Sequence, residues 1–391
     1  MKRILLVMEQ GGGLGHAAHA AALAAILQAR GHEVVVAGPP RELAAKSLAG
    51  VPYRLVPGPV CQLPPAPRPN FSWASLATVF WDLGLSRPDL TPALFDAWRA
   101  TYRDVKPDAI LFDAAPFARL AAIGLGIPRI EVGVPYGIVP PVSPLPSFKF
   151  WSRVPRSEAV PFEARLQAAI TKGLGIPDSY SCLGQLLDGD AALISSVPEL
   201  DPYPCVGRLY PGPVAPPSSG LPVEWTGAGR TAFAYLRAAS ADIGSIAHAL
   251  GSHFEDVVVA CADAPQQVID RFEGTHVRVF REFLDVRAIA RTANLIVSHA
   301  GSLMAIGVTH GIAQVALPTQ FEQLVSAQLL ARAGLGLMAL PAHPSACTAA
   351  IRTCAHPSWP RAALESARSR HADMSADPSA NWMRALDTVL G

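Results

Sequence analysis

The chain has 391 residues, of which half are hydrophobic and 16% are charged, and this length and composition predict two domains with large buried sheets. Lysine and arginine together number 32 and aspartate and glutamate 31, so the net charge of +1 gives no electrostatic reason to expect nucleic acid as a partner. Six scattered cysteines without a C-x-x-C pair argue against a disulfide framework or a zinc site.

The sequence shows no targeting or membrane-spanning segment. Its apolar N-terminal run is too short for a signal peptide and passes directly into glycines. Nothing approaches the ~20-residue apolar span of a transmembrane helix. We therefore expect a soluble, cytoplasmic protein, and the sequence leaves peripheral contact with a membrane open.

The first half opens with the pattern of a nucleotide-binding fold. Residues 4–8 form an apolar run that predicts a buried strand, and the turn GGGLGH follows at residues 11–16. Residues 17–30 are strong helix formers, Gly31 stands where a C-terminal cap is expected, and residues 34–36 begin the next strand. The glycine spacing departs from G-x-G-x-x-G, so the turn alone identifies no ligand. Two more strands are predicted at residues 109–112 and 129–133.

Proline marks the predicted domain boundary. The chain has 37 prolines, well above the usual ~5%, with clusters at residues 52–69, 135–146 and 198–222. The last cluster has the stiff character of an interdomain linker. We predict an N-terminal domain at residues 1–205, a linker at 206–222, a C-terminal domain at 223–372 and a terminal helical segment at 373–391.

The second half repeats the order of elements seen in the first. Strands are predicted at residues 231–236, 257–261 and 277–280, with a helix near 241–250. The segment NLIVSHAGSLMAIGVTHGIAQVALPTQFEQL at residues 294–324 then reads as strand, tight turn, helix and strand. Small residues and a helix N-terminus in this turn place backbone N–H groups where an anion binds. The turn therefore predicts a seat for the phosphates of a nucleotide.

Taken together, the two halves resemble the family-1 glycosyltransferases of GT-B type, including bacterial macrolide and rhamnolipid transferases. The resemblance implies an α/β fold with two Rossmann-like domains facing a cleft, and a C-terminal helix crossing back to the N-terminal domain. It also implies an inverting transferase that moves a sugar from a nucleotide-sugar donor to a hydroxyl of a small, largely apolar or aromatic acceptor. Neither a cofactor nor a metal ion is expected.

The resemblance implies two catalytic residues in the N-terminal domain. In this family the glycine turn carries a histidine that acts as the base, and His16 occupies that place. Asp113, at the end of the strand at residues 109–112, matches an aspartate that orients the base. On the residues alone, His16 is equally a capping or packed histidine, and Asp113 is equally an N-cap for a helix starting near Pro116.

The donor site of the family has a signature that this chain carries in altered form. The family reads strand-H-G-G-x-G-T, helix, strand, proline and an acid–glutamine pair. Here Ala300 and Leu303 replace glycines, Met304 replaces a threonine or serine, and Gly307 stands where many UDP-sugar enzymes have a ribose-binding glutamate. Several deoxysugar transferases also lack that glutamate, so a dTDP-sugar donor is favoured beside a UDP-sugar. The predicted nucleotide-sugar site consists of Gly13, Gly15, Arg281, His299, Ala300, Gly301, Ser302, Leu303, Met304, Glu322 and Gln323.

Each of these assignments has a structural alternative. His299 is also explained as a strand-end residue held by a neighbouring loop, and Ser302 as a helix N-cap. Glu322 and Gln323 are expected in a loop, where they either bind sugar hydroxyls or face solvent. Arg281 is assigned to the loop on the base side of the nucleotide.

The acceptor side is suggested by aromatic residues in the proline-rich N-terminal segments. They suit a flat, apolar acceptor, or they serve to pack these long segments. The residues are Phe71, Trp73, Phe80, Trp81, Tyr136, Phe148, Phe150 and Trp151. Two other functions share the fold and stay open: a non-catalytic GT-B protein that binds a ligand or partner, and a nucleotide-sugar 2-epimerase.

Overall fold

The structure is a computed structural model and forms two compact units. It describes residues 1–10, 15–43, 48, 54–59, 61, 63–203, 207–214, 220–227, 229–285, 289 and 291–391. Unit 1 contains Met1–Ser195, Pro202–Pro217 and Ser379–Gly391, and unit 2 contains Ser196–Asp201 and Ser218–Pro378. Within the described part of the chain, no helix is long and apolar enough to span a membrane.

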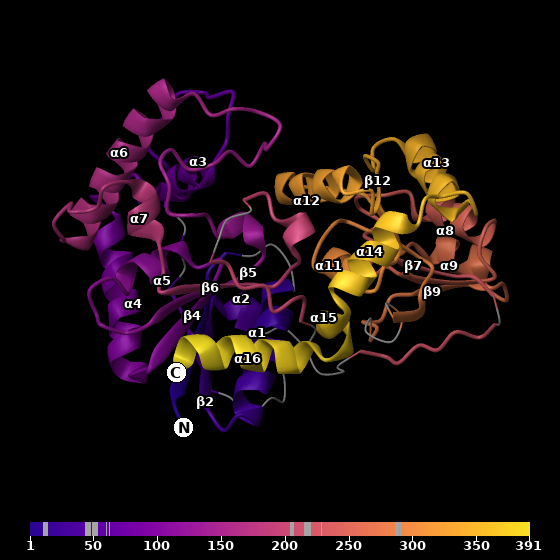
Figure 1. The fold of residues 1–391 in the computed structure, drawn as a ribbon, viewed down its shortest axis with the longest axis horizontal. Helices are drawn as coiled ribbons and strands as arrows, with labels where there is room; N and C mark the ends of the chain where they lie inside the picture. Colours follow the sequence, from indigo (N-terminus) through magenta and orange to yellow (C-terminus); the bar gives the residue numbers. More distant parts are fainter. Residues whose placement is uncertain are drawn as a thin grey trace. The chain divides into compact units, whose positions relative to one another are not determined.

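Unit 1 is built on a six-stranded sheet in the order β3-β2-β1-β4-β5-β6, with every neighbouring pair parallel. Its strands are β1 (Arg3–Met8), β2 (Glu33–Gly38), β3 (Arg54–Pro57), β4 (Ala109–Asp113), β5 (Arg129–Gly133) and β6 (Ala191–Ile194). Its helices are α1 (Gly15–Ala29), α2 (Pro40–Leu43), α3 (Leu76–Phe80), the π-helical turn η2 (Trp81–Leu85), α4 (Thr91–Val105), α5 (Pro116–Ala121), the 3-10 turn η3 (Pro135–Gly137), α6 (Arg156–Leu174), α7 (Leu183–Leu187) and α16 (Pro378–Leu390). Helices cover both faces of this sheet (Figure 1).

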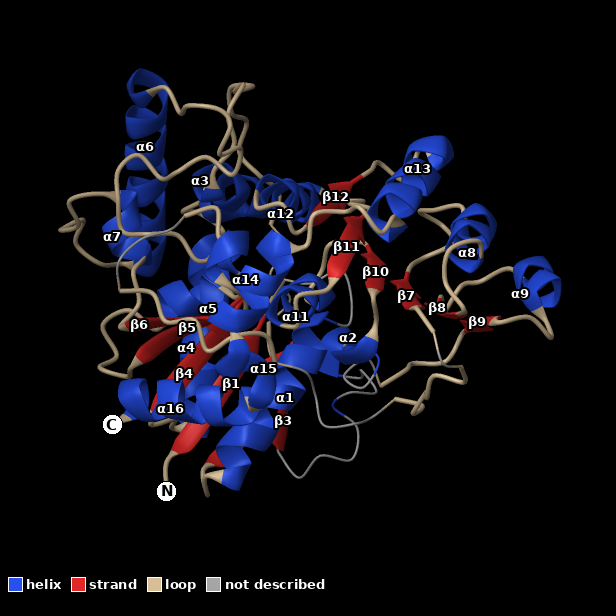
Figure 2. Cartoon of the chain, turned by 45° about the vertical axis from the view of Figure 1, so that its right-hand side comes forward, coloured by secondary structure: helices blue, strands red, loops and turns tan. Residues whose placement is uncertain are grey.

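Unit 2 has a second parallel six-stranded sheet, in the order β12-β11-β10-β7-β8-β9. Figure 2 shows these strands in one row, with α8, α9 and α13 along one side. The strands are β7 (Thr231–Tyr235), β8 (Asp256–Ala260), β9 (Val277–Phe280), β10 (Leu295–Ser298), β11 (Ala313–Ala316) and β12 (Gly336–Met338). The helices are η4 (Pro198–Leu200), α8 (Ile243–Gly251), α9 (Gln266–Phe272), α11 (Leu303–Thr309), α12 (Phe321–Arg332), α13 (Pro344–Ala355), α14 (Ala362–Arg370) and α15 (Ala372–Ala376).

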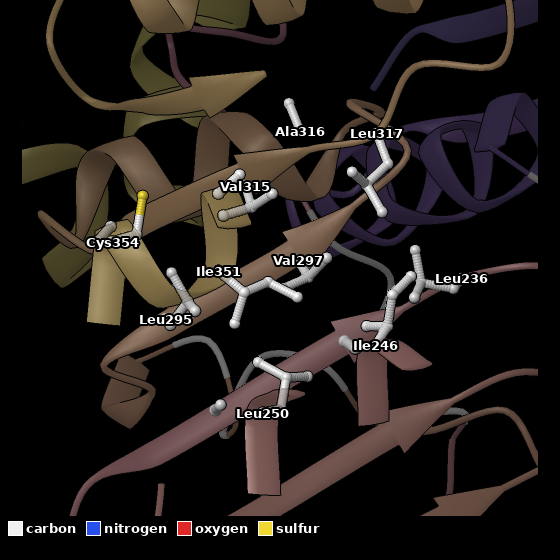
Figure 3. Close-up of a cluster of buried hydrophobic side chains, with 14 of the residues drawn as sticks. Leu236, Ile246, Leu250, Leu295, Val297, Val315, Ala316, Leu317, Ile351 and Cys354 are labelled. Atoms are coloured by element: carbon white, nitrogen blue, oxygen red, sulfur yellow. The ribbon is translucent and has the colours of Figure 1, made fainter. Parts of the chain in front are cut away.

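Alternation along the central strands buries both faces of the unit 2 sheet. Val257 and Val259 of β8 point into one core, whereas Val258 points into the other. The first core also takes Ile246 of α8 and Ile351 of α13 (Figure 3). A sheet covered on both faces explains why these strands read as continuous apolar runs rather than as alternating patterns.

The predicted strands and their parallel order are confirmed, and three short strands were missed. β3, β6 and β12 have three or four residues each and lie at sheet edges. An edge strand is covered less completely than a central one, so its apolar signal is weaker. The predicted linker at residues 206–222 contains the end of one segment of unit 1, Pro217, and the start of the long segment of unit 2, Ser218.

Candidate functional site

A polar cluster in unit 1 forms where β1, β4 and α1 meet. Met8 at the end of β1 lies beside Asp113, the last residue of β4, in the parallel register. α1 begins at Gly15, so His16 lies in its first turn. Because the carboxyl ends of parallel strands share one edge, the fold brings two residues together that are 97 positions apart in the chain.

His16 and Asp113 are in direct contact. Nδ1 of His16 lies 2.9 Å from Oδ1 of Asp113, within hydrogen-bond range. The His16 side chain is 28% exposed and that of Asp113 only 8%. A carboxylate accepts but does not donate, so the contact places a hydrogen on Nδ1 of His16 and the lone pair of the neutral ring on Nε2. The sequence predicted both residues, and the structure supplies their geometry.

A second histidine binds the other oxygen of the same carboxyl. Nδ1 of His19 lies 2.8 Å from Oδ2 of Asp113, and its side chain is 11% exposed. Sequence reasoning missed His19, although a signal was present. His16 ends the predicted glycine turn and His19 lies three residues later in the predicted helix; α1 contains both, and this spacing puts both side chains on one face.

The two imidazoles keep the buried carboxyl ionised. Burial by itself raises the pKa of Asp113, but the charge that His16 and His19 carry when protonated, together with their hydrogen bonds, more than offsets burial. The net result holds the pKa of Asp113 well below its usual range. The cluster therefore contains a fixed negative charge beside a partly exposed imidazole.

Gly133 makes room for this carboxyl at the end of β5. Its φ is 125°, and a Cβ added at this position would lie 2.8 Å from Oδ1 of Asp113. Both observations require glycine here, since an L side chain is disfavoured at positive φ and real Cβ atoms do not approach this closely. Gly133 was not among the predicted site residues.

Gly133→Ala is expected to destabilise the protein by about 2–4 kcal/mol, because it adds a clash with Asp113 to backbone strain. Gly124→Ala is the matched control, since Gly124 also has positive φ (80°) but its added Cβ would meet nothing within 4 Å. We expect the control to cost only about 1 kcal/mol. Urea denaturation of both variants measures the difference, and equal losses would show that the space beside Asp113 is not constrained.

Glu9 caps α5, the helix for which Asp113 was the N-cap alternative in the sequence. Its carboxylate oxygens accept hydrogen bonds from the N–H groups of Phe117 (2.8 Å) and Ala118 (2.7 Å) in the first turn of α5. The residue in the N-cap position of α5 is Ala115, whose methyl group cannot form a capping hydrogen bond. Burial raises the pKa of Glu9 to about 7, with the Phe117 and Ala118 N–H groups acting in the opposite direction. Glu9 therefore stabilises α5, and both oxygens of Asp113 face histidines.

The glycine turn is described only at its end. Gly15 is exposed at the start of α1, and an added Cβ there would meet nothing within 4 Å. The predicted contact of Gly13 with the donor lies outside the described residues.

In unit 2, His299 ties together three segments at the carboxyl edge of the sheet. Its Nδ1 lies 2.8 Å from the carbonyl oxygen of Leu317, after β11, and the N–H of Arg237, after β7, donates to its Nε2 at 3.0 Å. Burial is the main cause that lowers the pKa of His299. Both nitrogens of a neutral ring are thus engaged, as in the structural alternative considered above. A bond from His299 to a donor phosphate, as predicted, would require its hydrogen bond with Leu317 or with Arg237 to break.

The turn after His299 places its side chains on two different sides. Gly301 and Ser302 are exposed, whereas Leu303 (7% exposed) and Met304 (1%) lie in the core. Ser302 occupies the N-cap position of α11 without a capping hydrogen bond from its side chain. Leu303 and Met304 thus face away from any ligand at the turn. A phosphate at the turn would bind backbone N–H groups and the Ser302 hydroxyl.

Ala300, which replaces a glycine of the family signature, has a backbone conformation that favours glycine. Its φ is 60°, in the left-handed region that costs a non-glycine residue roughly 1–2 kcal/mol. Its methyl group lies in the core of unit 2, with only 5% of the residue exposed. The turn therefore keeps the glycine-type conformation without the glycine.

Gly307 is required by a buried neighbour. A Cβ added here would lie 2.6 Å from Nε2 of Gln314, which donates a hydrogen bond to the carbonyl of Met304 at 3.0 Å. A glutamate at Gly307 would point into Gln314 rather than into solvent. The lack of a side chain at Gly307 is thus part of how α11 packs on β11.

Two of the remaining predicted donor residues, Arg281 and Gln323, hold local structure. Arg281 donates from Nε (2.9 Å) and Nη2 (2.6 Å) to the carbonyl of Ala264 and so ties down the segment before α9. Glu322 and Gln323 lie in the first turn of α12, so the expectation of a loop was wrong. Oε1 of Gln323 accepts hydrogen bonds from the backbone N–H (2.8 Å) and hydroxyl (2.9 Å) of Thr319, much as in a capping box.

The aromatic residues of unit 1 divide into packed and partly exposed groups. Trp73, Phe80, Trp81 and Phe148 are buried, in keeping with the packing alternative. Phe71, Tyr136 and Phe150 are half-buried, and Trp151 is 47% exposed. Only this second group has surface to offer a ligand.

Comparisons with known proteins bear on the fold. No protein-family model and no curated protein matches the sequence. Among solved structures, the chain is similar to glycosyltransferase VinC in complex with dTDP (17% identity, 99% of each chain covered, TM-score 0.69). It is also similar to the Streptomyces sp. SF2575 glycosyltransferase complexed with thymidine diphosphate (20%, 99% of this chain and 100% of that chain, 0.61). A third similar structure is spinosyn rhamnosyltransferase SpnG complexed with spinosyn aglycone (20% identity, 99% of this chain and 100% of that chain covered, TM-score 0.62). These likenesses over the whole chain show the GT-B fold, with two Rossmann-like units.

Proposed function

We propose that this protein is an inverting glycosyltransferase that moves a sugar from a dTDP-sugar to a hydroxyl of a small, largely apolar acceptor. One observation carries the proposal: a partly exposed imidazole, His16, bonded through Nδ1 to a buried, ionised carboxylate, Asp113. A protein that only binds a ligand has no need of such a pair. Three structures of the same fold are glycosyltransferases by name, and this supports the assignment.

The chemistry follows from the pair. Nε2 of His16 takes the proton of the acceptor hydroxyl as the oxygen attacks the anomeric carbon of the donor. The bond from that carbon to the diphosphate breaks on the opposite face, which inverts the configuration. Asp113 stabilises the imidazolium that forms and holds the ring through Nδ1. The proton ends on His16, and the nucleoside diphosphate leaves with the electron pair.

Donor binding is assigned to unit 2. Gly301 and Ser302 are exposed at the start of α11. The N–H of Met304 donates to the carbonyl oxygen of Gly301 at 2.9 Å, and the N–H groups before it in the turn have no acceptor within the helix. The proposed nucleotide is dTDP for two reasons. Gly307 stands where many UDP-sugar enzymes have a ribose-binding glutamate, and two structures with this fold were solved with dTDP. The base end of the site is assigned to Arg281. The sugar end is assigned to Glu322 and Gln323.

Thermal-shift titration against dTDP, UDP, GDP and ADP tests the donor. We expect dTDP to stabilise the protein, by ~2.7 kcal/mol at 100 times its dissociation constant. Thymidine, which has the same base but no phosphate, is the control and should stabilise far less. A shift with UDP alone would change the assigned nucleotide, and no shift with any of the four would contradict the donor site.

Transfer itself is tested by incubating the protein with a panel of dTDP-sugars and apolar alcohols and phenols. Mass spectrometry should detect a product heavier than the acceptor by one sugar residue, and NMR should show the inverted anomeric configuration. A product with retained configuration would contradict His16 as base. Stabilisation by dTDP without any transfer would favour a binding protein.

A further inference from the structure

We infer that His19 is a positioning residue for the reaction: it holds the Asp113 carboxylate in the orientation that His16 requires. The inference rests on the proposed function and adds a residue that the family resemblance does not supply. His16 binds Oδ1 and His19 binds Oδ2, at 2.9 and 2.8 Å.

Burial of the Asp113 carboxylate requires a partner for each of its oxygens. Asp113 is 6% exposed, and an ionised carboxylate this deep must have both oxygens hydrogen-bonded. Oδ1 is bounded by His16 and by the backbone of Gly133, which leaves no space for a side-chain atom. His19 supplies the donor to Oδ2. A carboxyl group held on both oxygens cannot rotate about its Cβ–Cγ bond without losing one of these bonds.

The contact with Asp113 selects one tautomer of His19. Asp113 only accepts, so the contact at Oδ2 requires a hydrogen on Nδ1 of His19. Its Nε2 is buried and finds no hydrogen-bond partner among the residues that the structure describes. A hydrogen on Nε2 would therefore be a buried donor without an acceptor, which is costly. The neutral ring with its hydrogen on Nδ1 is the form that fits this environment.

A neighbouring indole limits the orientation of the His19 ring. The indole of Trp382 packs edge-on against His19, with ring centroids 5.8 Å apart and planes at 70°. Trp382 is fully buried and donates from Nε1 to the carbonyl oxygen of Gly212 at 2.9 Å. This indole comes from α16, which lies beside α1 in unit 1 (Figure 1). His19 is thus held between a fixed aromatic wall and the carboxylate.

A double-mutant cycle on transfer tests the inference. His19→Leu removes the donor and should lower kcat about 10-fold, with the KM values for donor and acceptor unchanged, because a slightly misplaced catalytic group costs rate rather than binding. His19→Asn restores an N–H near the Nδ1 position and should recover most of the rate. In an Asp113→Asn background, His19→Leu should change kcat less than twofold, because His19 acts through the charge of Asp113.

The control is His32→Leu, the same substitution at a half-buried histidine of unit 1 whose Nδ1 instead accepts from the N–H of Lys2. It should leave kcat unchanged. Wild-type kcat in His19→Leu, or an equal loss with and without the Asp113 charge, would overturn the inference. An Asn variant as slow as the Leu variant would also overturn it. Asparagine and leucine are similar in size, so equal rates would mean that His19 only fills space.

NMR of the wild-type protein tests the same inference without transfer. Two-bond ¹H–¹⁵N spectra at neutral pH should show His19 with its hydrogen on Nδ1, and Asp113→Asn should shift that signal. A hydrogen on Nε2 of His19 would overturn the inference. This measurement tests the role of His19 even if the His19→Leu variant does not fold. It also separates the two proposals, because an inactive protein with the expected His19 signal would contradict the proposed function alone.

Discussion

Replacing His16 by alanine is expected to lower kcat for sugar transfer about 10³-fold, because general-base catalysis by a positioned histidine contributes ~10²–10⁴-fold. Asp113→Asn should cause a loss of similar size. Its amide can donate to Nδ1 of His16, which stabilises the wrong tautomer and removes the charge that the imidazolium needs. The two substitutions together should cost little more than either alone, since the residues act as one unit.

Binding must survive for this result to identify a base. The dTDP-dependent thermal shift of His16→Ala should equal that of the wild type, because donor binding is assigned to unit 2. His32→Ala serves as the control for loss of a histidine from unit 1 and should keep full activity. Wild-type kcat in His16→Ala would refute the mechanism, and loss of the dTDP shift would show that His16 binds the donor instead.

The second large effect concerns stability and comes from Glu163 in α6. The side chain is 2% exposed, its Oε1 accepts a hydrogen bond from the N–H of Leu145 at 2.7 Å, and its Oε2 has no partner among the described residues. Burial raises the pKa of Glu163 to about 7, above its ordinary value of 4.5. Glu163→Gln is therefore expected to stabilise the protein by about 2 kcal/mol at pH 8 and to change stability little at pH 4.5.

The sign follows from proton binding in the two states. Between pH 4.5 and 7 the unfolded chain loses the Glu163 proton while the folded protein keeps it. The unfolded state then binds fewer protons, so the free energy of unfolding falls as pH rises through this window and stays low above it. Each pH unit of the window is worth up to ~1.4 kcal/mol, and relaxation of the site reduces the total. Glutamine keeps the acceptor for Leu145 and removes the ionisation.

Calorimetry of the wild type and Glu163→Gln at pH 4.5 and 8 measures this effect. A gain of about 2 kcal/mol corresponds to a rise in Tm of roughly 4–8 °C at pH 8. Glu158→Gln, on an exposed position of the same helix, is the matched control and should not raise Tm. Glu9 contributes a fall in stability over the same window in both proteins, so only the difference between them reports on Glu163. A gain that is equal at both pH values would contradict the ionisation argument.

Local sequence patterns predicted the central strands and missed the edge strands. Apolar runs predicted the central strands of both sheets, because strands buried on both faces leave continuous signals. They missed β3, β6 and β12, which are short edge strands. The donor signature located the turn after β10, but not that Leu303 and Met304 face the core or that Gln323 accepts hydrogen bonds from Thr319 just before α12.

The sequence by itself determined the fold class, the helix that starts near His16, the strand end with Asp113 and the turn after β10, since each is encoded in a short local pattern. Only the tertiary structure decided that His16 and His19 share one carboxylate, that Glu9 rather than Asp113 stabilises the start of α5, and that Gly133 and Gly307 exist to make space. The physical reason is that hydrogen-bond partners and steric exclusions join side chains far apart in the chain. Their distances are set by how strands and helices pack, which no local pattern records.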